Sequence, residues 1–430
     1  MGERVMYVDE GTPVNCVFPV RLRGHVSREG LQAALDGLQR KHPLLRASIG
    51  QEGARPYFLL QGEAFPIPIR EVERRSESYW LAVVQEEWKE RFDGEAGPLA
   101  RLVWVRGTGA SGRPGDEAGR EMGTGDGSTD FISELILVCP HCICDGMTGV
   151  TLMRELLSLL DKPGLKLGSY ERFGSVDELL PDLPPLTRAG RWKMHFFVTL
   201  GRLFYRCMSL QSLPERGADY VLHWRVDGRK VDALARRCKE EGVGLYAVLC
   251  VCWLEAFQSI RPKAARNKVI CPVDIRRYVP SIGADNMFAF APIVNLSVAR
   301  KVEGVWSRAR AMRVSMEDKV GKLKAGELLR AGELFHGAVR DVVRHMRTNV
   351  GGHDLTFSNM GRLDIPGKYK GFVVEKVFSP TVVFPWKNPT TLVTSSYGGE
   401  MDFAFVSNES YLPEGEAEAI RAKAMELLFS

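Results

Sequence analysis

The residues with the clearest chemical potential lie in one short segment, Cys139 to Gly146, between an apolar run and an amphipathic one. His141 comes just after the predicted strand 135–138, where a fixed backbone can aim an imidazole. The unperturbed pKa of an imidazole, about 6.5, suits proton abstraction near neutral pH. The pattern makes His141 a candidate general base, with a structural histidine beside an apolar strand as the alternative.

The same segment also offers metal-ligand chemistry. Its three cysteines, with His141 and Asp145, form a thiolate and imidazole set of the kind that binds zinc. Structural zinc sites normally take further ligands from a second knuckle, whereas Cys250 and Cys252 stand inside an apolar run with no matching motif. We therefore predict no metal, and cysteines that pack in the core as small apolar side chains.

Around this segment the pattern alternates between strands and amphipathic helices. Two β-rich runs, 102–105 and 135–138, flank a stretch of 24 residues, 107–130, of which eight are glycine. We predict a hairpin with a long inserted loop and no phosphate cradle, because no helix opens after the glycines. The further predicted helices cover 27–41, 150–160, 188–210, 231–240, 245–257 and a stretch after Pro413, and the further strands 269–271, 292–296, 391–397 and 401–406. This alternation predicts an α/β fold.

The chain length predicts more than one lobe. A chain of 430 residues exceeds the usual size of one hydrophobic core, so two domains or two fused half-domains are expected. A stretch rich in proline and glycine, 162–185, marks the boundary. We predict an N-terminal lobe over 1–165, a linker with a crossover helix over 166–215, and a C-terminal lobe over 216–430.

Composition narrows the class of protein and its partners. The 58 basic and 53 acidic residues give a net charge of +5 spread along the chain, which argues against a nucleic-acid partner. Nine cysteines, several of them in apolar runs, and an amino terminus without an apolar signal core predict a cytoplasmic location. The longest apolar run, Leu245 to Phe257, is too short to cross a membrane and contains Glu255.

Two further segments have a composition suited to a partner. Residues 188–210 mix Arg and Lys with dense aromatic side chains, which fits peripheral contact with a membrane or a crossover helix at the domain junction. Residues 300–347 hold twelve basic and six acidic residues. This excess fits the phosphates of coenzyme A or an acidic carrier protein, and it also fits a solvated helix face.

Here the sequence resembles the condensation-domain and chloramphenicol-acetyltransferase-like superfamily of thioester-dependent acyltransferases. The superfamily signature is His-His-x-x-x-Asp-Gly, and residues 140–146 match it except that Pro140 replaces the first histidine. Further motifs follow in the family's order along almost the whole chain, namely Lys41 to Arg46, Phe92-Asp93 with Gly97 to Arg101, Pro272 to Arg276, Asp285-Asn286 with Pro292 to Leu296, and Phe357 to Gly361. The last is similar to the Ser-Asn-x-Gly strand of stand-alone alcohol and polyketide acyltransferases. The plant-type Asp-Phe-Gly-Trp-Gly motif is absent, which favours the microbial stand-alone branch.

The resemblance implies two chloramphenicol-acetyltransferase-like lobes that form a V with a central substrate tunnel and His141 at its centre. It implies transfer of an acyl group from acyl-CoA or an acyl carrier protein to a small alcohol or amine, with no bound cofactor. His141 would take the acceptor's proton as the acceptor attacks the thioester carbonyl. Asp145 is implied to turn away from His141 and to pair with Arg276 of the other lobe.

Three more residues are candidates for supporting roles. Ser358 and Asn359 are predicted donors to the tetrahedral oxyanion, with closure of a strand end as the alternative. Gly146 is expected either to let the turn and the substrate approach closely or simply to start a helix.

Two other activities share the resemblance. One is a free-standing peptide-synthetase condensation enzyme that uses an aminoacyl carrier donor. The other is a non-catalytic scaffold member, which the replacement of the first motif histidine by Pro140 supports. Joint retention of His141, Asp145, Gly146 and Arg276 favours an enzyme.

Overall fold

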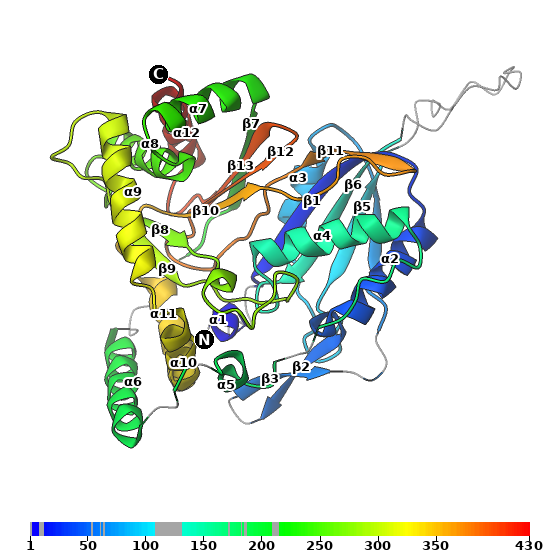
Figure 1. Cartoon of the computed structure of the whole chain (residues 1–430), viewed down its shortest axis with the longest axis horizontal. Coiled ribbons are helices and arrows are strands. Elements are labelled where there is room, and N and C mark those ends of the chain that lie inside the picture. The colour runs from blue at the N-terminus through cyan, green and yellow to red at the C-terminus, as the bar shows by residue number, and fades with distance from the viewer. Residues whose placement is uncertain are drawn as a thin grey trace, which may run out of the picture.

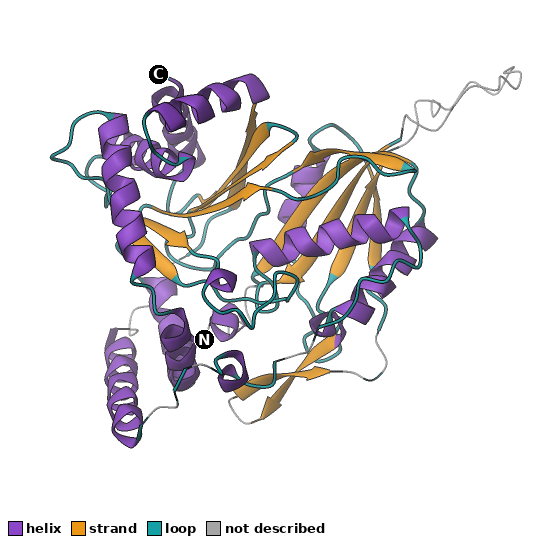
Figure 2. Ribbon diagram, in the orientation of Figure 1, coloured by secondary structure: helices purple, strands orange, loops and turns teal. Residues whose placement is uncertain are grey.

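The computed structural model describes residues 2–7, 13–52, 55–60, 62, 65–107, 131–170, 173–181, 183–184, 187–208 and 215–430. These residues form two α/β lobes, each built on a mixed β-sheet with helices packed against it (Figure 1). Figure 2 shows the two sheets side by side, with helices packed against them. The predicted hairpin around the glycine-rich stretch is confirmed, since its two strands pair in antiparallel fashion, while residues 108–130 of the loop lie outside the described residues.

The N-terminal lobe has a five-stranded sheet with the order β11-β1-β6-β5-β4. Its strands are β1 (Asn15–Gly24), β4 (Ile69–Glu73), β5 (Arg101–Arg106), β6 (Ile132–Pro140) and β11 (Phe372–Val377). The helices α2 (Arg28–Lys41) and α4 (Gly146–Asp161) pack together over one face, and α3 (Tyr79–Glu87) contacts β1 and β6 from the other. The range 216–430 that we assigned to the C-terminal lobe therefore contributes one strand, β11, to the N-terminal sheet.

Strand β6, which leads to His141, is buried on both faces. Its alternate residues Leu135, Leu137 and Cys139 belong to the core beneath α2 and α4, while Ile136 and Val138 belong to the cluster around α3. Because successive side chains of a strand point to opposite faces, an unbroken apolar run is what a doubly covered strand requires. This double burial fixes the strand end from which the His141 turn departs.

The position of α4 depends on one glycine. A Cβ atom added at Gly149 would lie 1.9 Å from the ring of Phe18, a buried residue of β1. No side chain fits in that space, so the absence of a Cβ lets α4 lie close against the sheet. The close contact holds the first turn of α4, and with it Asp145, at a fixed distance from β1.

The C-terminal lobe has a six-stranded sheet with the order β7-β13-β12-β10-β8-β9. Its strands are β7 (Asp219–Val226), β8 (Val269–Pro272), β9 (Ile293–Leu296), β10 (Leu355–Arg362), β12 (Thr391–Tyr397) and β13 (Glu400–Asn408). The helices of this lobe are α7 (Gly228–Glu240), α8 (Leu245–Ile260), α9 (Val305–Gly321) and α12 (Glu414–Phe429). Helix α8, the apolar run of the sequence, is buried in this lobe's core.

The remaining elements are short or peripheral (Figure 1). They are α1 (Gly2–Tyr7), η1 (Pro43–Arg46), β2 (Ala47–Glu52), β3 (Arg55–Leu60), α5 (Val176–Leu179), α6 (Arg188–Met208), η2 (Ile275–Arg277), α10 (Ala325–Leu334), η3 (Phe335–Ala338) and α11 (Val339–Thr348). Helix α6 covers most of the predicted crossover segment, and it packs on α10, η3 and α11 rather than on either sheet.

Candidate active site at the His141 turn

His141 begins the turn between β6 and α4, and hydrogen bonds hold both its backbone and its ring. The backbone N–H donates to the carbonyl of Val14 over 2.8 Å. The ring Nδ1 lies 2.8 Å from the carbonyl oxygen of Cys144. A carbonyl only accepts, so Nδ1 carries the proton and the neutral ring keeps Nε2 as its basic nitrogen. The turn itself thus selects the tautomer that a general base needs.

Cys16 is a second partner of the His141 ring, and our sequence reasoning did not find it. Strand β1 runs antiparallel to β6 with Cys16 opposite Cys139, and the Cys16 thiol is hydrogen-bonded to the His141 ring. Burial alone would lower the pKa of His141, but the charge interaction and hydrogen bond with Cys16 outweigh it and raise the pKa to about 9. Burial by itself would raise the pKa of Cys16. A hydrogen bond with Cys144, together with the charge interaction and hydrogen bond with His141, outweighs this and lowers the pKa to about 6. The two groups therefore favour a thiolate and imidazolium pair.

The carboxylate of Asp145 is hydrogen-bonded to Thr148 and Arg276, and neither bond involves the His141 ring. As the N-cap of α4, its carboxylate accepts from the backbone N–H and the hydroxyl of Thr148, both over 2.8 Å. The other side of the carboxylate pairs with Arg276, whose Nη1 lies 2.7 Å from Oδ2. Both side chains are mostly shielded from solvent, at 17% and 8% exposed respectively.

Arg276 extends this contact into the C-terminal lobe. It lies in η2, and its Nη2 also donates to the carbonyl of Asn286 over 2.9 Å. The arginine therefore joins the first turn of α4 to two loops of the other lobe. The Asp145–Arg276 pair therefore stabilises the position of the turn. The His141 ring is oriented by its contacts with Cys144 and Cys16.

Gly146 and the predicted Ser358-Asn359 strand meet through Met360. A Cβ atom at Gly146 would lie 2.6 Å from the Met360 Sδ, so the end of β10 reaches the start of α4. Ser358 donates to the Met360 Sδ over 3.9 Å, and the Asn359 side chain accepts from the Gly361 N–H over 2.9 Å. These contacts remain within β10, which fits the strand-end alternative, and an oxyanion role for the two residues stays a prediction.

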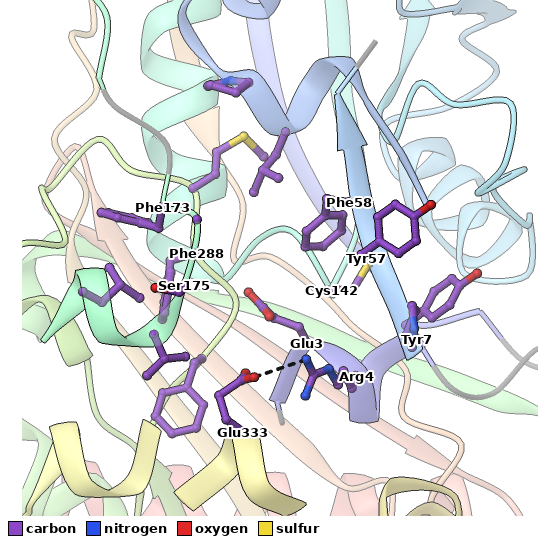
Figure 3. A pocket seen from close by; sticks show the side chains of 18 of the residues that line it. Glu3, Arg4, Tyr7, Tyr57, Phe58, Cys142, Phe173, Ser175, Phe288 and Glu333 are labelled. Atoms are coloured by element: carbon purple, nitrogen blue, oxygen red, sulfur yellow. Dashed lines mark hydrogen bonds and ion pairs between the residues drawn. The ribbon is translucent and has the colours of Figure 1, made fainter. Parts of the chain in front are cut away.

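A cavity of about 570 Å³ opens beside the turn, between residues of both lobes. Figure 3 shows aromatic side chains that face each other across it, with Tyr57, Phe58 and Cys142 on one side and Phe173 and Phe288 on the other. Of the described residues, Cys142 lines the wall while its neighbour His141 does not. On a further side, the His141 ring lies 5.8 Å from the ring of Phe384, in the segment that joins β11 to β12.

One end of the cavity is charged. Helix α1 contributes Glu3 and Arg4, and Arg4 pairs with Glu333 of α10 over 3.4 Å (Figure 3). Burial raises the pKa of Glu3 above its ordinary value. The cavity thus combines an apolar, aromatic body with a small polar end.

A second charged cluster joins the lobes near the site, and it also escaped sequence reasoning. Lys41 at the end of α2 pairs with Glu155 of α4 and, over 2.8 Å, with Asp285 of the other lobe. The fully buried His42 lies 2.7 Å from the other oxygen of Glu155 and 3.0 Å from the hydroxyl of Tyr170. Lys41 and His42 begin the Lys41 to Arg46 motif of the sequence analysis. In this chain, these two residues of the motif help to join the lobes.

The three cysteines of the turn are buried and form no disulfide with one another. Burial raises the pKa values of Cys142 and Cys144, so both remain protonated thiols. Within the described ranges, no group of three or more His, Cys, Asp or Glu side chains is arranged to hold a metal ion.

The basic stretch 300–347 folds into α9, α10, η3 and α11, and many of its charges have acidic partners. Arg308 pairs with Glu255, and α9 and its neighbours hold further pairs such as Lys322 with Asp318 and Lys324 with Glu327. The Lys322 and Lys324 pairs are exposed, which is typical of a solvated helix face. Binding of donor phosphates by this stretch stays a prediction.

The chain has the two-lobed fold of the condensation-domain and chloramphenicol-acetyltransferase-like acyltransferases. Polyketide synthase associated protein 5 from Mycobacterium tuberculosis is 16% identical, over 99% of this chain and 96% of its own, with a TM-score of 0.63. The trichothecene 15-O-acetyltransferase TRI3 from Fusarium sporotrichioides is 14% identical, over 100% and 93%, with a TM-score of 0.66. The epimerization domain of the third module of tyrocidine synthetase B is 11% identical, over 95% and 90%, with a TM-score of 0.59. At these identities the likeness concerns the fold.

No protein-family model and no curated protein matches this chain. Structural likeness confirms the predicted α/β fold of two lobes. The central substrate tunnel and the roles of individual residues stay predictions.

Proposed function

We propose that this protein is an acyltransferase that moves an acyl group from a thioester, acyl-CoA or an acyl carrier protein, to a hydroxyl or amine. The observation that carries the proposal is the hydrogen bond between His141 Nδ1 and the carbonyl of Cys144. It leaves Nε2 as the basic nitrogen of the neutral ring, the form that His141 takes as the pH rises through its pKa of about 9. The turn that carries it is fixed between two lobes of an acyltransferase fold. Asp145, engaged by Arg276, has a structural part.

In the proposed reaction the Nε2 atom of His141 takes the proton of the acceptor's O–H or N–H group. The freed oxygen or nitrogen forms a bond to the thioester carbonyl carbon, which gives a tetrahedral oxyanion. The C–S bond then breaks, the carbonyl reforms, and the leaving thiolate takes the proton from His141. The products are an ester or amide and a free thiol, with no covalent acyl-enzyme.

The cavity supports an apolar substrate group. Its opposed aromatic side chains suit an acyl chain or a hydrophobic acceptor of small-molecule size, and Cys142 brings its wall to within one residue of His141. Several proteins with this fold are domains of carrier-dependent synthetases, which supports a carrier-bound donor as an alternative to acyl-CoA.

The test is thiol release from a panel of acyl-CoA and carrier-bound thioesters, with pooled alcohols and amines as acceptors. A positioned general base contributes about 10²–10⁴-fold, so His141→Ala should lose acceptor-dependent release by that factor. His25→Ala, which changes an exposed histidine, is the matched control. Both variants should retain the wild-type circular dichroism spectrum.

Two outcomes would contradict the proposal. Acceptor-dependent release that is equal in wild type and His141→Ala would remove His141 from the chemistry. Background release from every donor, carrier-bound ones included, would favour the non-catalytic scaffold.

A further inference from the structure

Helix α6 exposes a continuous apolar face. Successive residues of an α-helix are rotated by about 100°, so residues spaced 4, 4 and 3 apart, such as Trp192, Phe196, Leu200 and Leu203, form one stripe. Phe197 and Phe204 widen it. The exposed fractions of these side chains are Trp192 79%, Phe196 65%, Leu203 59%, Phe204 54%, Phe197 53% and Leu200 52%. Large side chains gathered on one face at such exposure mark a surface for a partner.

A different, narrow face of α6 holds the helix on the protein. Val198 is buried, Gly201 faces the ring of Phe335 in η3, and the Tyr205 ring lies 5.3 Å from that of His345 in α11. Phe204, at the margin of the apolar face, also has its ring 6.5 Å from that of His345. The stripe from Trp192 to Leu203 is therefore the part of this face that points away from the molecule. Figure 1 shows α6 at the edge of the protein, beside α10 and α11.

The charge of α6 is entirely basic. Its 21 residues include no Asp or Glu. Four of its basic residues, Arg188, Arg191, Arg202 and Arg206, fall by their spacing on a side adjacent to the apolar stripe. Exposed Arg340 and Arg344 belong to α11, the helix on which α6 packs. The surface therefore joins an aromatic face to a positive one.

We propose that α6 binds the surface of an anionic membrane, lying in its plane. An amphipathic helix with Trp, Phe and Leu on one face and Arg on the next buries its apolar face at the headgroup boundary, while the arginines meet anionic headgroups. Within the described ranges, no single helix is long and apolar enough to cross a bilayer, and α7 with α8 reaches that length only as a pair bent by 103°. A convex helix at the edge of a protein suits a flat surface better than it suits an extended peptide.

Flotation of the whole protein with vesicles tests this proposal. One vesicle preparation is phosphatidylcholine alone, and the other is an equimolar mixture with phosphatidylglycerol. We expect the protein to float with the mixed vesicles and much less with the neutral ones. The double variant Trp192→Ser/Phe196→Ser should remove binding, and Arg188→Gln/Arg191→Gln should weaken it about fivefold per arginine.

Two controls match these variants. Phe65→Ser removes an equally exposed aromatic ring elsewhere, and Arg229→Gln/Arg236→Gln removes two exposed arginines of α7. Both should leave vesicle binding unchanged. The thermal unfolding temperature of every variant shows that the fold is retained.

Three results would overturn the proposal. The first is an absence of binding to either vesicle preparation. The second is equal binding by the wild type and the Trp192→Ser/Phe196→Ser variant. The third is concentration-dependent self-association that this variant abolishes, without vesicle binding, because a second copy of the chain would then cover the face.

Discussion

The His141 turn and helix α6 differ in how many of their side chains have partners within the protein. In the turn, the ring of His141 and the carboxylate of Asp145 each have two or more polar partners within the fold. On α6, six large apolar side chains lie at least half exposed. The turn is complete without a partner macromolecule, whereas α6 is not.

This difference teaches how each region should respond to substitution. Removal of a buried polar group that has a full set of partners lowers the free energy of unfolding strongly, because it leaves another buried group unpaired. Exposed apolar side chains contribute little to folding, so their removal should affect a partner and not the fold. Three variants test the contrast, from the largest expected effect to the smallest.

Asp145→Ala should cause the largest loss of stability. It leaves the mostly buried Arg276 without its main counter-ion, which costs about 3–5 kcal/mol, and it removes the α4 cap. Urea unfolding followed by circular dichroism measures the change in the free energy of unfolding. Asp227→Ala is the matched control, because it removes only the exposed N-cap of α7 and should cost about 1 kcal/mol. An Asp145→Ala protein as stable as wild type but slow would show that Asp145 acts in the chemistry.

Cys16→Ser should shift the pH dependence of activity. The base must be deprotonated, and its pKa is about 9 in the presence of Cys16, so kcat/KM should rise with pH to a midpoint near that value. A serine hydroxyl stays neutral, which removes the thiolate charge and moves the midpoint down towards the ordinary histidine value of about 6.5. The measurement is the pH profile of kcat/KM. Cys207→Ser, an exposed thiol of α6, should leave the profile unchanged, and an unchanged profile in Cys16→Ser would exclude the pair.

Trp192→Ser/Phe196→Ser should have the smallest effect on the fold. Both side chains lie mainly in solvent, so each change should alter the free energy of unfolding by no more than about 0.5 kcal/mol. Acyl transfer to a water-dissolved acceptor should also stay at the wild-type rate. A large loss of stability would show that α6 packs more tightly than its exposure indicates, and the contrast with the turn would fail.

Most of the helices and strands near the site could be predicted from the sequence. The period of apolar residues predicted α2, α4, α7 and α8 to within a few residues, because helical amphipathicity is a local property. It also predicted the β5-β6 hairpin and both strands that pair as β12 and β13. The resemblance further led us to expect Asp145 beside Arg276, which the structure places in an ion pair.

Only the tertiary structure decided which distant groups meet. The β1-β6 register sets Cys16 beside His141, and a one-residue slip would point it to the opposite face. The crossing of β11 into the N-terminal sheet depends on pairing over more than 300 residues of separation. The apolar stripe of α6 fits a buried junction and an exposed surface equally, since lipid and protein demand the same amphipathicity. Sequence alone thus determined the elements and a candidate base, and the fold determined that base's pKa and the face of α6 left open.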